Sequence, residues 1–168
     1  FAVELQALRK EETEVRQRVA EWRQLLSTIR LRLKRLGLPK IPADVEEALQ
    51  ASSRSLQMLE TRLEELPFNV HYIVSQSEDV NGTFKTLQER IDKVVFEVTY
   101  AERLVQYANR FRRQDNEIHM SLTIAETKFL AGDYERTITL GEQVLEQFEP
   151  DSIERIRKAC GQPETMHA

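Results

Sequence analysis

The sequence has 168 residues, of which 31% are charged and 40% hydrophobic, with only five glycines and five prolines. Such a composition favours long helices with charged surfaces over a sheet protein, and the length suits one domain or two small ones. The net charge of −4 gives no general attraction to phosphate backbones, so we expect no nucleic-acid binding as the main activity. A single cysteine, Cys160, cannot form an internal disulfide, and no apolar run approaches the ~20 residues that a membrane span needs. We therefore expect a soluble fragment that is not inserted in a membrane. Because it starts at Phe1 without a methionine, we expect it to come from a longer chain.

The first predicted helix covers residues 3–36, where apolar side chains recur at alternating steps of four and three. This heptad spacing places a narrow apolar seam along one side of a helix. Gly37 fits the position just past the helix end, and the prolines at 39 and 42 prevent its continuation. The seam consists of Leu8, Val15, Val19, Trp22, Leu26, Ile29, Leu33 and Leu36.

Two further heptad helices follow. The second is predicted from about Val45 to Leu66, with Asp44 as its cap and Pro67 as its end. The third begins after a cap at Asn69 and is predicted to run to about residue 113. The Asn81-Gly82 pair is typical of turns, but the heptad register is the same on both sides, so we expect the helix to continue through it.

A helical hairpin and a short last helix are predicted after the polar break at residues 113–117, where Asp115 or Asn116 supplies a cap. Gly132-Asp133 predicts a tight reversal between the two hairpin helices, and the last helix is predicted to reach about Cys160, capped by Asp151 or Ser152. The hairpin is typical of a tetratricopeptide-type helix pair, but one copy cannot form a repeat array. We therefore expect it to cover the end of the long third helix, on the side of Tyr100, Leu104, Tyr107 and Phe111.

Together these patterns predict an all-α protein. We expect an antiparallel three-helix bundle over residues 1–95 that shares its long helix with a second, C-terminal three-helix bundle over residues 96–160. Residues 161–168 are predicted to be a disordered tail.

No arrangement of residues in the sequence predicts an enzyme. The histidines His71, His119 and His167 never recur at the spacing that places two imidazoles on one helix face, and the glycines stand singly rather than in a phosphate-binding loop. Cys160 lies near the end of the chain, where a nucleophile would lack supporting groups. We expect no catalytic activity, no cofactor and no metal site.

The end of the third helix has two unlike faces. Its apolar arc is too wide for one seam, and its opposite arc combines neutral amides with guanidinium groups. Amides beside a planar guanidinium offer donors and acceptors in fixed positions, which suits recognition of a carboxylate, a backbone segment or an acidic peptide. The same arc could also be an ordinary solvated face, or the start of helix fraying at Asn109. The candidate partner-binding residues are Gln106, Asn109 and Arg110, flanked by Arg103 and Arg113.

The string LVQYANRFRR at residues 104–113 carries a family resemblance, together with the AExxFxxGxYExT hairpin at residues 125–137, the LEQFEP segment and the LPxxP loop at residues 38–42. These motifs, which span most of the chain, resemble the C-terminal region of the EzrA family of septation ring formation regulators. Phe111 departs from the family's usual tyrosine.

The resemblance implies a non-catalytic division regulator with spectrin-like repeats. It implies an N-terminal membrane anchor in the full-length protein and a location on the cytoplasmic face of the bacterial cell membrane, at the division septum. It further implies interaction with FtsZ and with other division and cell-wall synthesis proteins, and restraint of FtsZ ring formation away from midcell. A family patch linked to septal localisation corresponds to Gln106, Asn109 and Arg110.

Two other interpretations remain open from the sequence. In one, the chain is a structural coiled-coil rod segment whose seams pair between chains and which has no division role. In the other, the hairpin at residues 118–148 is the groove of a helical peptide-binding module.

Overall fold

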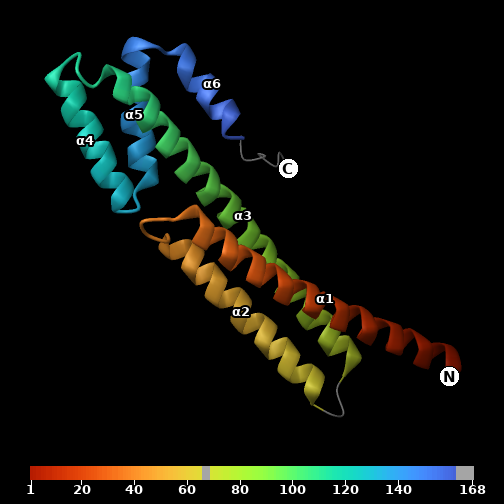
Figure 1. The fold of residues 1–168 in the computed structure, drawn as a ribbon. Coiled ribbons are helices and arrows are strands. Elements are labelled where there is room, and N and C mark those ends of the chain that lie inside the picture. The colour runs from red at the N-terminus through yellow and green to blue at the C-terminus, as the bar shows by residue number, and fades with distance from the viewer. Residues whose placement is uncertain (66–68, 162–168) are drawn as a thin grey trace. The chain divides into compact units, whose positions relative to one another are not determined.

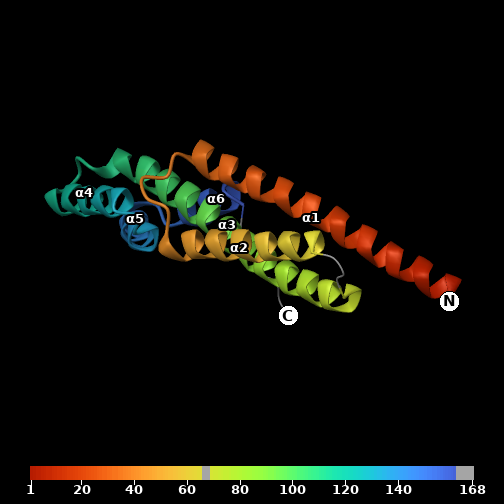
Figure 2. The same ribbon diagram turned by 90° about the horizontal axis from the view of Figure 1, so that it is seen from below.

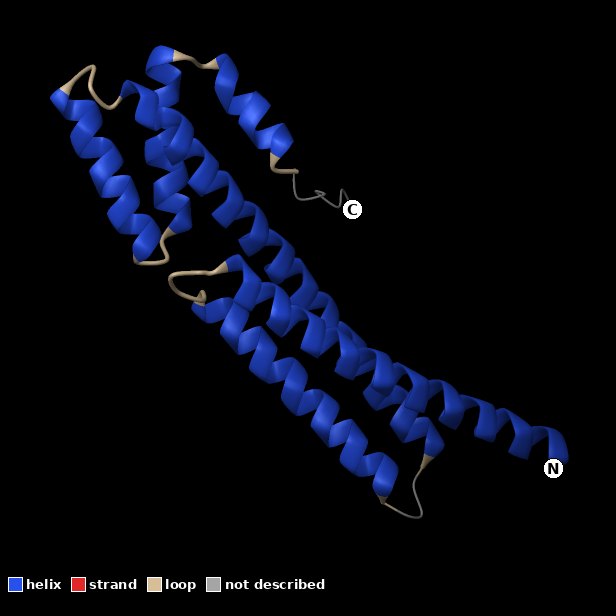
Figure 3. Cartoon of the chain, viewed as in Figure 1, coloured by secondary structure: helices blue, strands red, loops and turns tan. Residues whose placement is uncertain are grey.

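The computed structural model describes residues 1–65 and 69–161, and in those residues the chain is helical without strands (Figures 1 and 3). The all-α prediction is confirmed. The elements in chain order are α1 (Ala2–Leu36), α2 (Ala43–Glu64), α3 (Val70–Ala108), the 3-10 turn η1 (Asn109–Phe111), α4 (Asn116–Leu130), α5 (Tyr134–Phe148) and α6 (Asp151–Ala159).

The chain divides into two compact units. The first contains Phe1–Arg35 and Ala43–Ile91, and the second contains Leu36–Pro42 with the chain from Asp92 onward. The helix α3 therefore supplies residues to both units. The predicted domain boundary at residue 95 stays a prediction.

In the first unit, the heptad seams of α1, α2 and the first part of α3 form the core. The rings of Trp22 of α1 and Phe84 of α3 stack with centroids 5.8 Å apart, so aromatic side chains from the seams of these two helices pack together. The first turns of α1 run past the ends of α2 and α3 (Figure 2), and Phe1 and Val3 are accordingly exposed. The buried apolar residues of this unit are Val15, Trp22, Leu26, Ile29, Leu33, Val45, Ala48, Leu56, Leu59, Leu63, Ile73, Val80, Phe84, Leu87 and Ile91.

Helix ends in this unit follow local chemistry. Gly37 adopts φ +62 just past α1, a conformation that side chains disfavour, as expected for the helix end. The Asn69 side chain accepts hydrogen bonds from the backbone N–H groups of His71 and Tyr72, at 3.0 and 3.3 Å, so the predicted cap of α3 is confirmed. Asp44 lies inside the first turn of α2 instead of before it. The predicted end of α2 at Leu66 and Pro67 lies outside the described residues, and α3 continues through Gly82 as expected.

In the second unit, α4 and α5 pack on the apolar side of α3, as the width of its apolar arc predicted. The buried cluster consists of Tyr100, Leu104, Ala108, Ile118, Leu122, Val144 and Leu145. Gly132 makes the predicted reversal with φ +85, and its α-carbon approaches the loop before α2, because a Cβ there would lie 3.1 Å from Lys40 Cβ. Tyr134 fixes the same loop by donating a 3.0 Å hydrogen bond to the Lys40 carbonyl.

Three predicted details need correction or lie outside the structure. The helix α3 ends at Ala108 instead of near residue 113, because the next carbonyls accept bonds three residues on, as in Arg112 N–H to Asn109 O at 3.1 Å. Asp115 caps α4 as predicted, but the N-cap of α6 is Pro150, whose side chain makes no capping bond. Ser152 instead donates its hydroxyl to the Glu149 carbonyl at 2.5 Å. The predicted disordered tail lies outside the described residues from position 162 on. Among the described helices, none is long and apolar enough to cross a membrane.

Candidate partner-binding site

The five predicted residues follow one another along the end of α3 and the turn after it. Arg103 and Gln106 belong to α3, Asn109 and Arg110 to η1, and Arg113 to the loop before α4. All five are exposed, because the opposite side of α3 packs in the core of the second unit. They are therefore available to a partner, but neither of the two hollows described below is lined by all five.

One depression, the α6-side hollow, lies between α3 and α6 and has a volume of about 340 Å³. Its α3 wall carries two predicted guanidinium groups, and α6 adds a third from Arg155. The hollow is lined by Arg103, Gln106, Tyr107, Arg110, Arg155, Ile156, Ala159 and Cys160.

Tyr107 organises the charges of the α6-side hollow. The guanidinium of Arg110 lies over the Tyr107 ring at 3.7 Å from the centroid, in a cation–π contact. The Tyr107 hydroxyl donates to Glu149 at 2.8 Å and accepts from Arg155 at 2.9 Å. Glu149 also lies 3.6 Å from Arg155 and 4.0 Å from Arg110, so one carboxylate is shared by two guanidinium groups. With Arg103, the hollow has three positive charges against one negative charge.

A second depression, the α4-side hollow, lies between α3 and α4 and has a volume of about 400 Å³. Its walls are largely apolar, and the side chain of Leu130 is 68% exposed at its rim. The hollow is lined by Glu102, Val105, Gln106, Asn109, Glu126, Phe129 and Leu130.

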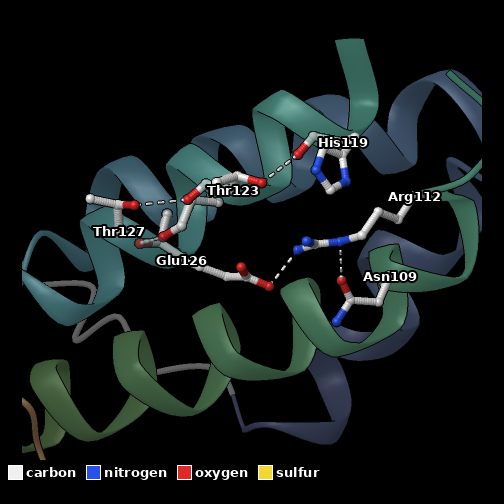
Figure 4. A network of polar contacts seen from close by, with 8 residues as sticks. Asn109, Arg112, His119, Thr123, Glu126 and Thr127 are labelled. Atoms are coloured by element: carbon white, nitrogen blue, oxygen red, sulfur yellow. Dashed lines mark hydrogen bonds and ion pairs between the residues drawn. The ribbon is translucent and has the colours of Figure 1, made fainter. Parts of the chain in front are cut away.

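A polar network at this hollow fixes the side chain of Asn109 (Figure 4). Asn109 Oδ1 accepts a 3.0 Å hydrogen bond from Arg112 Nε, and the same guanidinium is ion-paired with Glu126 of α4. Because the amide oxygen is occupied, the NH2 group of Asn109 is left to donate to a partner. The hydroxyls of Thr123 and Thr127 bond carbonyls of their own helix, so they do not extend the network across the hollow.

The structure thus divides the predicted patch around Gln106, which lines both hollows. Arg103 and Arg110 belong to the α6 side and Asn109 to the α4 side, whereas Arg113 lines neither of these two hollows. The patch as a binding site stays a prediction.

Sequence reasoning missed Tyr107, Arg112 and Arg155. By its spacing Tyr107 belongs to the apolar arc of α3, and its hydroxyl is the signal that points to a polar partner, since a buried tyrosine hydroxyl usually finds one. The amphipathic pattern of α6 places Arg155 on its polar face, which marks it as a candidate site residue. The pattern does not indicate that Arg155 contacts Tyr107 of α3.

Two titratable groups at the end of α6 have shifted pKa values, and both shifts favour the protonated form. Burial raises the pKa of the Cys160 thiol, which the nearby Arg103 charge opposes, so the thiol has no enhanced thiolate character. Burial tends to lower the pKa of Arg157, but hydrogen bonds to Glu142 and Tyr100 outweigh it and the pKa is raised. No group of three or more His, Cys, Asp or Glu side chains in the described part of the chain could hold a metal ion.

The fold and the exposed helix end define an all-α helical-bundle protein with a candidate protein-binding surface. The family model described as "Septation ring formation regulator, EzrA" matches residues 1–160, and the chain belongs to this family.

Relatives named "Septation ring formation regulator EzrA" support the assignment. The protein from Bacillus pumilus is 28% identical over 156 residues, which cover 93% of this chain and 28% of the relative. Those from Bacillus licheniformis and Listeria welshimeri are each 29% identical over 160 residues, covering 95% of this chain and 28% of the relative. The chain thus spans well under a third of the length of these curated relatives. No solved structure matches it.

Proposed function

We propose that this chain is the partner-recognition region of a non-catalytic regulator of septation ring formation. The observation that carries the proposal is the exposed row of Gln106, Asn109 and Arg110 at the end of α3, in a chain that belongs to a family named for septation. Two of the three groups are preoriented, since Arg110 lies over the Tyr107 ring and Asn109 is held by Arg112. Preorientation lowers the entropy that a partner must overcome on binding.

We further propose the setting that the family resemblance implies. The full-length protein is anchored by an N-terminal transmembrane helix on the cytoplasmic face of the cell membrane and localises to the division septum. It interacts with FtsZ and with other division and cell-wall synthesis proteins, and it restrains FtsZ ring formation away from midcell. The first unit then acts as a spectrin-like repeat.

The test replaces Gln106, Asn109 and Arg110 by alanine in the full-length protein and follows septal recruitment by fluorescence. We expect recruitment to be lost, while the helicity and melting temperature of the purified chain stay unchanged, because all three side chains are exposed.

The matched control replaces Arg136, Gln143 and Gln147 by alanine, which removes one guanidinium and two amides from exposed positions of α5. This variant should still be recruited. Recruitment of a stably folded patch variant would show that the three side chains are not the recognition surface.

The peptide-binding alternative is less well supported. The residues that would line a groove in the hairpin are already packed, since Ile118, Leu122, Val144 and Leu145 are buried against α3. A peptide could reach them only if the core of the second unit opened. The rod alternative depends on pairing between chains and is tested by the oligomeric state.

A further inference from the structure

We infer that the partner segment recognised by the Gln106 region is an acidic stretch of protein that crosses α3, with a carboxylate in the α6-side hollow and an apolar side chain in the α4-side hollow. This inference rests on the proposed recognition function and specifies the chemistry of the partner.

The α6-side hollow is selective for a negative group. Arg103, Arg110 and Arg155 line it, and Glu149 is the carboxylate that contacts two of them. The excess positive charge runs against the net charge of −4 of the whole chain, so it is a local feature. The guanidinium of Arg110 is held over the Tyr107 ring at 3.7 Å from the centroid, and its planar set of N–H groups suits a forked contact with a carboxylate.

The α4-side hollow instead favours an apolar side chain over a negative group. Val105, Phe129 and Leu130 provide apolar walls, and Leu130 is 68% exposed although it is a large apolar side chain. Glu102 also lines this hollow, and Glu126 is already paired with Arg112. A second carboxylate would be repelled there, whereas an aliphatic or aromatic side chain would cover exposed apolar surface.

Gln106 lines both hollows, so one segment can occupy them together across the ridge of α3. The width of a helix with its side chains is about 10 Å, which an extended chain spans in about three residues. The amides of Gln106 and Asn109 then face the backbone of the crossing segment, to which amide groups can donate and accept hydrogen bonds. Side chains on one face of an extended strand recur every two residues, so we expect the carboxylate and the apolar side chain of the partner to be separated by two or four positions.

The test uses the full-length protein and two substitutions outside the Gln106–Asn109–Arg110 triplet. Leu130→Gln removes the apolar rim without adding charge, and Arg103→Glu reverses one charge of the α6-side hollow. Each should reduce septal recruitment about tenfold or more, because each removes one of the two contacts that hold the crossing segment. Arg103→Lys should retain most of the recruitment because it keeps the positive charge.

Two controls match these changes. Met120→Gln replaces a 62% exposed apolar side chain elsewhere on α4, and Arg136→Glu reverses an exposed charge on α5. Both should be recruited normally, and thermal melting of all purified variants should match the parent chain.

The outcomes are distinguishable from failure of the proposed function. If the triple-alanine patch variant loses recruitment but Leu130→Gln does not, the patch stands and the apolar contact is refuted. If Arg103→Glu is recruited normally, or Arg103→Lys fails as badly as Arg103→Glu, the acidic partner is refuted. Recruitment of the triple-alanine variant itself would overturn the proposed function first.

Discussion

Tyr100 places a phenol hydroxyl in the core of the second unit, where the residue is only 2% exposed. The hydroxyl donates a 2.6 Å hydrogen bond to Glu142, whose carboxylate also accepts a 2.8 Å bond from Arg157. Burial and, after it, the Glu142 carboxylate raise the pKa of Tyr100 above its usual value of 10.0. The folded state therefore prefers the neutral phenol, and the stability that this contributes is fully present below about pH 10 and is lost as the pH rises further.

This cluster makes the stability of a Tyr100→Phe variant depend on pH in a defined direction. Near pH 8 we expect the variant to be less stable than the parent by about 1–1.5 kcal/mol, the usual net contribution of one hydrogen bond. Above pH 10 the parent loses the contribution of the neutral phenol, so the difference should shrink. Urea unfolding followed by circular dichroism at pH 8 and pH 11 measures both differences.

Tyr72→Phe is the control for this comparison, because the residue is 49% exposed and the change should cost less than about 0.5 kcal/mol near pH 8. A Tyr100→Phe deficit that stays constant or grows with alkaline pH would contradict the role assigned to the buried hydroxyl.

At the scale of single elements, the helices of the sequence were predictable because their signals are local. Heptad spacing fixes which side of a helix is apolar, and Asn69 and Asp115 cap their helices with their own side chains. The end of α3 was not predictable in the same way. Nothing in the spacing around Asn109 distinguishes a continuing α-helix from the 3-10 turn that follows Ala108.

The candidate site shows the same limit. Periodicity gives the angle of Gln106, Asn109 and Arg110 around α3, but not which neighbouring helix lies beside each one. Their division between two hollows follows from the packing of α4 and α6, which depends on contacts between side chains distant in sequence. The stacked rings of Phe111 and Phe148, with centroids 4.8 Å apart, are one such contact.

Gly141 in α5 provides a test of that packing. A Cβ at this position would lie 3.1 Å from the Cβ of the fully buried Leu104 on α3, so the two helices would have to separate. We expect Gly141→Ala to destabilise the chain by about 1–3 kcal/mol, because overpacking outweighs the gain of about 1 kcal/mol in helix propensity. Thermal and urea unfolding measure the change.

Gly82→Ala is the matched variant, since Gly82 lies in α3 with nothing within 4 Å of an added Cβ. There the propensity gain stands alone, and we expect stabilisation by up to about 1 kcal/mol. The two substitutions should therefore shift the free energy of unfolding in opposite directions. Stabilisation by both would show that α3 and α5 are less closely packed than the 3.1 Å approach to Leu104 indicates.

At the scale of the whole chain, the apolar seams are covered by the chain itself. Trp22, Leu59 and Phe84 of the first unit and Leu104 and Leu145 of the second are all less than 9% exposed without a second copy. The remaining large apolar surface includes the first turns of α1, where Phe1 is 96% and Val3 is 78% exposed. Such a short segment offers too little area for a stable dimer.

We therefore expect the purified chain to sediment as a monomer over a wide concentration range, with a melting temperature that does not depend on concentration. The rod interpretation makes the opposite prediction, because seams that pair between chains couple folding to association and raise the melting temperature with concentration. A double variant, Val3→Gln with Leu5→Gln, distinguishes association through the first turns of α1 from pairing of the heptad seams between chains. It should abolish any self-association that comes from the first turns of α1 and leave helicity unchanged. A dimer that survives these two substitutions, and whose melting temperature rises with concentration, would mean that the buried seams exchange between chains, and the intramolecular bundle would then be wrong.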